Sequence, residues 1–139
     1  TILVFFIPNL ANTTGIIGSQ SSVFTIRAIA TGEIERSFRG LSKVFLKEFV
    51  TVMLLALAVG FGMFMIALIR GGFWMKLALV VGISAMVSCT TAAIVGIILP
   101  MLLRKMNIDP AGADVPFITT IGDVITYATY FSLAKLILG

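Results

Sequence analysis

One carboxylate lies where a charge is costly, at Asp123, between the uncharged runs FITTIG and VITYATYF. If Pro116 begins a helix, Asp123 lies about 10 Å along its axis. An ionised Asp inside a membrane span costs about 2.5–3.5 kcal/mol or more, so it should face a cavity or a partner. The chain has no His, and the Lys and Arg residues within the expected spans, such as Arg27 and Lys135, all lie near the ends. The pattern therefore favours a mobile cation as the counter-charge of Asp123. The alternative is a protonated Asp that is hydrogen-bonded to a Ser or Thr.

A stretch of amide, hydroxyl and glycine residues at 9–22 is the second polar feature inside an apolar sequence. Its candidate pore-lining residues are Asn12, Gly15, Gly18 and Gln20. Such groups face lipid only at a large cost, so protein or water must satisfy them. Gly-x-x-Gly and Ser are also typical of helix packing seams. Alone the stretch leaves both interpretations open, and together with Asp123 it favours a polar pathway.

Two further carboxylates, Asp109 and Asp114, lie beside prolines in the segment 105–116. Helix capping and compensation of the helix dipole is the interpretation that we favour for them. The alternative is an acidic ring at the cytoplasmic mouth of a pore, which would concentrate cations.

Composition disfavours several other chemistries. The chain has no His and one Cys, Cys89, so it has no imidazole metal site and no internal disulfide. Gly122-Asp123 matches part of the GxGD element of intramembrane aspartyl proteases, but position 120 is Thr and a second intramembrane Asp is lacking. We therefore expect no enzyme. A structural or scaffold subunit without its own transport activity is the alternative function.

The elements that position these residues are membrane-spanning helices. Hydrophobic residues make up 59% of the chain and charged residues 12%, about half the charge of a soluble domain. Residues 49–69 and 77–103 are runs of 21 and 27 uncharged residues, and a spanning helix needs about 20. We predict an all-α, polytopic membrane helix bundle, a single transmembrane domain over 1–139, with spans at about 1–31, 43–69, 74–104 and 116–138.

Basic residues orient this bundle. Seven of the ten fall on one side, at positions 27, 36, 39, 43, 47, 104 and 105; the other side has Arg70, Lys76 and Lys135. The positive-inside rule then places loops 32–47 and 105–116 in the cytoplasm and the C-terminus outside. The same rule accounts for the net charge of +4 without a nucleic-acid partner. We expect a multi-pass protein of the cell membrane.

Four runs carry a family resemblance: FIPNLANTTGIIGSQSSVFTIRAIATGEI at 6–34, VFLKEF at 44–49, GIILPMLLRKMNIDPA at 96–111 and PFITTIGDVITYATYFSLAKLIL at 116–138. Together they cover most of the chain, and they resemble the transmembrane domain of the MgtE magnesium transporter family. That family's fold has five helices, of which this sequence matches the last four. The resemblance implies a first helix before Thr1 and, in bacterial members, an upstream regulatory domain that senses magnesium.

The resemblance also implies a role for the acidic span. Asp123 would hold a hydrated Mg²⁺ in the pore, with the backbone of Thr119 and Thr120 nearby. Mg²⁺ sheds water reluctantly and is often held by one or two carboxylates through retained waters. A single copy of the domain implies a homodimer with the pore on its two-fold axis. Family members commonly have Gly-Asn after the first polar turn, where this chain has Gly15-Ile16, so Co²⁺ or Mn²⁺ is an alternative ion.

Overall fold

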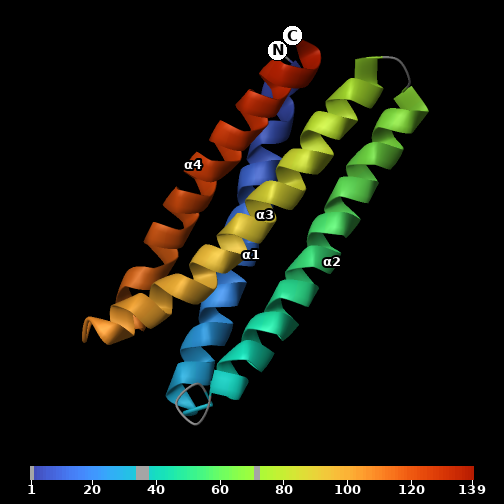
Figure 1. The fold of residues 1–139 in the computed structure, drawn as a ribbon. Coiled ribbons are helices and arrows are strands. Elements are labelled where there is room, and N and C mark those ends of the chain that lie inside the picture. Colours follow the sequence, from blue (N-terminus) through green and yellow to red (C-terminus); the bar gives the residue numbers. More distant parts are fainter. Residues whose placement is uncertain (1, 34–37, 71–72) are drawn as a thin grey trace.

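The computed structural model describes residues 2–33, 38–70 and 73–139, and these form a bundle of long helices (Figure 1). The helices are α1 (Ile2–Ala30), α2 (Phe38–Arg70), α3 (Phe73–Lys105) and α4 (Pro110–Leu138). Helix α3 packs against the other three, and α1 also packs against α4. Both termini lie at one end of the bundle, and the chain passes from α1 to α2 and from α3 to α4 at the other end. The predicted all-α membrane bundle is confirmed.

Two helices begin earlier than predicted. Helix α2 begins at Phe38 rather than at 43, and α4 begins at Pro110 rather than at 116. The prediction of loops at 32–47 and 105–116 is therefore wrong in part, because 38–47 and 110–116 are helical. The first residues of α2 include several charged ones, and these are helical because Lys, Arg and Glu are good helix formers. The Asp109 carboxylate accepts a hydrogen bond of 3.0 Å from the Ala111 N–H, which caps α4, and Pro110 suits the first helical position.

Three of the helices are long and apolar enough to cross a membrane, over Phe45–Ile66, Met75–Lys105 and Pro116–Leu138. Among the described residues, helix α1 is not one of these candidate spans, and its middle carries polar residues. Four of those, Thr14, Ser21, Ser22 and Thr25, are fully buried inside the bundle. Protein therefore shields these polar groups from lipid, and the crossing of the membrane by α1 stays a prediction.

Glycines set how closely the helices approach. A Cβ at Gly96 of α3 would overlap the carbonyl oxygen of Gly18 on α1, so these two backbones are in contact. A Cβ at Gly60 of α2 would lie 3.5 Å from the carbonyl oxygen of Gly82 on α3, an ordinary contact distance. Small residues at such crossings let helices pack in the absence of a hydrophobic driving force.

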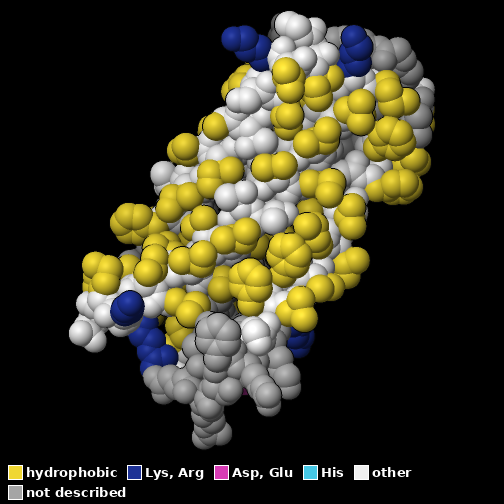
Figure 2. Space-filling view, viewed as in Figure 1, with side chains coloured by type: hydrophobic (Ala, Val, Ile, Leu, Met, Phe, Trp, Pro, Cys, Tyr) yellow, Lys and Arg dark blue, Asp and Glu magenta, His cyan; other side chains and the backbone are white. Residues whose placement is uncertain are grey.

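The surface agrees with a lipid environment. Figure 2 shows apolar side chains over the middle of the visible face and Lys and Arg side chains toward its two ends. Beneath this surface, an apolar cluster includes Leu10, Leu77 and Tyr130. The Tyr130 hydroxyl donates a hydrogen bond of 2.9 Å to the Leu3 carbonyl, which ties α4 to α1 close to both termini.

Candidate functional site

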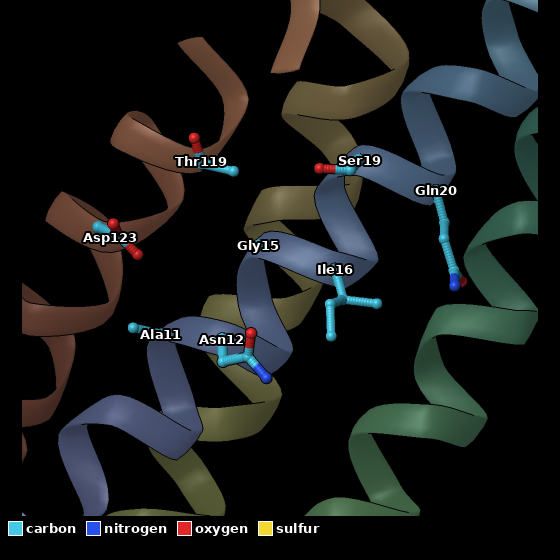
Figure 3. A pocket seen from close by; sticks show the side chains of 8 residues that line it. All are labelled: Ala11, Asn12, Gly15, Ile16, Ser19, Gln20, Thr119 and Asp123. Carbon is cyan, nitrogen blue, oxygen red and sulfur yellow. The ribbon is translucent and has the colours of Figure 1, made fainter. Parts of the chain in front are cut away.

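A groove of about 500 Å³ lies between α1 and α4. It is lined by Ala11, Asn12, Gly15, Ile16, Ser19 and Gln20 from α1 and by Thr119 and Asp123 from α4. Figure 3 shows the side chains of Thr119 and Asp123 projecting from α4 on the side of α1. Helix packing thus brings the intramembrane carboxylate beside the polar stretch, although more than a hundred residues separate them in sequence.

The Asp123 side chain is partly exposed to this groove. No hydrogen bond or ion pair joins its carboxylate to another described residue. The nearby hydroxyls instead bond to the backbone of their own helix: Thr119 donates to the Pro116 carbonyl at 3.2 Å and Thr126 to the Gly122 carbonyl at 2.7 Å. The alternative of a carboxyl bonded to a Ser or Thr therefore finds no support in the described part of the chain.

The groove has one carboxylate rather than a cage of ligands. Among the side chains that the structure describes, no three of His, Cys, Asp or Glu are grouped so that they could hold a metal ion. A dehydrated ion needs several protein ligands, whereas an ion that keeps its water shell needs only one or two carboxylates. The arrangement therefore suits a hydrated cation better than a stripped one.

Helix α1 presents different faces to the groove and to α3. The groove residues recur with a spacing of four, at 11, 15 and 19 and at 12, 16 and 20, which places them along one side of a helix. Thr14, Gly18 and Thr25 are buried, and Gly18 lies against Ala92 of α3 and Ile118 of α4. The stretch 9–22 therefore has a packing face and a groove face, and the polar pathway stays a prediction.

Several residues that the sequence singled out lie elsewhere. Gly18 was predicted to line the pore, but it is buried where α1 meets α3 and α4, because its lack of a Cβ permits that approach. Thr120 is exposed outside the groove, and its hydroxyl donates to the Pro116 carbonyl at 2.7 Å. Asp109 caps α4 at the end of the bundle away from the termini. The side chain of Asp114 lies outside the described residues.

Sequence reasoning missed three groove residues, Ala11, Ile16 and Ser19. The four-residue spacing from the predicted Asn12, Gly15 and Gln20 would have found them, because it marks one side of a helix. Ile16 is 49% exposed and lines the groove. The groove therefore combines one charge, several neutral polar groups and one bulky apolar side chain.

Fold and groove together define a polytopic helical membrane protein with an acidic groove within the span of its helices. Residues 7–133 match the family model MgtE, described as a divalent cation transporter. The chain belongs to this family.

Its relatives include proteins named magnesium transporter MgtE. The chain is 37% identical to the one from Thermus thermophilus over 99% of its own length, and 30% identical to the one from Enterococcus faecalis over 98%. It is 29% identical to the one from Bacillus subtilis over 95%. The match covers only 30% of the Thermus thermophilus protein and 29% of each of the other two.

Proposed function

We propose that this chain is the pore-forming membrane part of a divalent-cation transporter, with Mg²⁺ as its ion and Asp123 as the ion-binding carboxylate. The observation that carries the proposal is the Asp123 carboxylate, which lines a groove together with neutral polar side chains and has no described cationic partner. An ionised group in that position needs a counter-charge. The names of the relatives, magnesium transporters, support Mg²⁺ as that counter-charge.

The groove has room for an ion that keeps its waters. Six waters at about 30 Å³ each occupy about 180 Å³, and the groove has about 500 Å³. Asn12 and Ser19 line the same groove and can hydrogen-bond to waters of the ion's shell. Asp123 would then attract the ion by charge, while the neutral polar groups would position its water shell.

A second copy of the chain completes the pore in this proposal. One copy supplies one intramembrane carboxylate and a groove that is open along α1 and α4. Two copies related by a two-fold axis would place two Asp123 carboxylates toward one ion, consistent with the one or two carboxylates that Mg²⁺ commonly takes. Tyr127 lies one turn beyond Asp123 on α4 and is 39% exposed. In a Cys89→Ala background, Tyr127→Cys should form a disulfide between the two copies in the membrane, and a protein that transports as a monomer would refute the dimer.

The proposed orientation places the connections from α1 to α2 and from α3 to α4 in the cytoplasm, with both ends of this segment outside. These connections lie at the same end of the bundle, and seven of the ten Lys and Arg residues lie in them or in the adjoining ends of the helices. Glu33 and Met106 are exposed there. Cysteines introduced at these positions should react with an impermeant maleimide only from the cytoplasmic side, and labelling from outside would reverse the orientation.

Ion-competition uptake tests the function itself. The full-length protein in liposomes should take up Mg²⁺, and excess Co²⁺ or Mn²⁺ should compete weakly. Stronger uptake of Co²⁺ or Mn²⁺ than of Mg²⁺ would assign the pore to that ion instead. Absence of uptake of any divalent cation would favour a scaffold subunit.

A further inference from the structure

A second pocket lies where α1 ends and α2 begins, apart from Asp123. It has a volume of about 300 Å³ and is lined by Phe24, Arg27, Ala28, Thr31, Glu33 and Lys47. The pocket therefore combines two cationic side chains with an aromatic ring, a hydroxyl and one carboxylate. Two cations in one pocket make it unsuited to a divalent cation.

The cations of this pocket have no ion pair with any carboxylate that the structure describes. The Lys47 ammonium lies 5.9 Å from the centre of the Phe24 ring, within the range of a cation–π contact. No ion pair joins Arg27 or Lys47 to Glu33 or to any other described carboxylate. Among the described residues that line the pocket, two side chains are basic and one is acidic. An anionic group is the ligand that this excess of basic side chains favours.

An apolar groove continues from the pocket along α1. It has a volume of about 300 Å³ and is lined by Ser19, Gln20, Val23, Phe24 and Arg27. Phe24 and Arg27 line both spaces, so the two are adjacent. Val23, which is 60% exposed, extends the apolar surface of this groove along α1, away from the pocket and toward the middle of the helix. A ligand that fits both spaces has an anionic head and an apolar tail.

We infer that this pocket binds the phosphate of a membrane phospholipid, with one acyl chain along the groove beside Val23 and Phe24. Arg27 would bind the phosphate through its guanidinium, which makes strong, charge-assisted hydrogen bonds to phosphate oxygens. Lys47 would add a second charge while its ammonium rests near Phe24. Basic pockets between membrane helices on the cytoplasmic side bind anionic lipid headgroups elsewhere. The apolar groove distinguishes this ligand from a free phosphate ion or an acidic protein segment.

Native mass spectrometry of the full-length protein tests the inference, with dioleoyl phosphatidylglycerol as the added lipid. The wild type should retain this lipid, and Arg27→Gln with Lys47→Gln should lower its apparent affinity roughly tenfold or more, because each basic residue near a membrane surface contributes to lipid attraction. Lys105→Gln is the matched control: it removes an exposed charge from the same end of the bundle and lines neither space. Its lipid retention should equal that of the wild type.

A second variant tests the tail independently of charge. Val23→Trp should fill the groove and lower lipid retention while leaving Arg27 and Lys47 in place. Inorganic phosphate should raise the thermal midpoint less than the lipid does. Equal retention by the wild type and the double Gln variant, or equal stabilisation by inorganic phosphate and lipid, would overturn the inference. Ser19 and Gln20 line both this groove and the one beside Asp123, but none of these variants changes them. These readouts do not depend on ion uptake, so failure of the lipid site and failure of the proposed pore can be told apart.

Discussion

Two faces of α1 have similar residue types but different surroundings. The face toward the groove has Asn12, Gly15 and Ser19, which line about 500 Å³ of open space beside Asp123. The face toward α3 has Gly18 and fully buried hydroxyls such as Ser22, and the helix backbones there are in contact at Gly96. Small polar residues line an open groove in one place and a close helix contact in the other. The neighbouring helix makes the difference, since α4 places the Asp123 carboxylate beside the groove.

This comparison separates function from packing within one helix. A change on the groove face should alter ion handling and leave the fold stable. A change on the face toward α3 should alter stability first, and transport only as a consequence. Four variants test this division, and they follow in order of expected effect.

The largest effect is expected from Asp123→Asn, which keeps the shape of the side chain and removes its charge. Mg²⁺ uptake by the full-length protein in liposomes should fall to background. Stability without ion should hold or rise, because two like charges would no longer face each other in the dimer. A ligand at 100 times its dissociation constant stabilises a protein by about 2.7 kcal/mol, and the part of the Mg²⁺ stabilisation that depends on this site should disappear.

Asp123→Glu is the control for charge. It keeps the carboxylate and moves it by one methylene, so uptake should be reduced but measurable. Uptake at the wild-type rate by the Asn variant would end the claim that Asp123 binds the ion. Unfolding of the Asn variant would instead assign the carboxylate to the fold.

The next effect is expected from Gly96→Ala, on the face of α3 that meets α1. The new Cβ would overlap the Gly18 carbonyl oxygen, and overpacking of this kind costs about 1–3 kcal/mol. Gly60→Ala is the matched control, because its Cβ would lie 3.5 Å from the Gly82 carbonyl oxygen and Ala is the better helix former. Thermal unfolding in detergent should show a lower midpoint for Gly96→Ala and little or no loss for Gly60→Ala. Equal midpoints would mean that α1 and α3 are not held in contact at Gly96.

The sequence predicts the bundle well because membrane spans are a matter of length and apolar composition. Asp123 could also be singled out, since a charge in a span is rare and costly. The starts of α2 and α4 were misplaced because charged or proline-flanked residues were assigned to loops, although Asp109 and Pro110 form a favourable helix start. Such residues occur both in loops and at helix starts, and the local capping geometry decides between the two.

The division of α1 into two faces could not be predicted from residue types alone. Gly15 and Gly18 are both glycines in one polar run, and only their neighbours differ. Gly15 lines the groove, while Gly18 is enclosed by Ala92 and Ile118. Those neighbours come from α3 and α4, so the assignment depends on tertiary packing that a single helical pattern does not contain.

A smaller effect is expected from Asn12→Ala combined with Ser19→Ala. Both residues line the groove and neither has a hydrogen bond to a described residue, so the fold should not depend on them. Uptake should fall a few-fold rather than to background, because Asp123 still attracts the ion while its water shell loses hydrogen-bond partners worth about 0.5–1.5 kcal/mol each. Uptake kinetics and the thermal midpoint should be measured together. A lowered midpoint with unchanged uptake would reverse the assignment of this face.

The smallest effect is expected from Ser88→Ala on α3. The Ser88 hydroxyl is fully buried, and it has no hydrogen-bond partner among the described residues. A buried hydroxyl that lacks a partner costs about 1–3 kcal/mol on the scale of protein mutations, so its removal should leave the thermal midpoint unchanged or raise it. Thr126→Val is the contrasting variant, because the equally buried Thr126 hydroxyl donates a hydrogen bond of 2.7 Å to the Gly122 carbonyl. Loss of that bond should lower the midpoint modestly. If Ser88→Ala were destabilised by more than Thr126→Val, the hydroxyl would have a partner in the membrane, such as an enclosed water, and polar chemistry would extend from the groove into the packed interior.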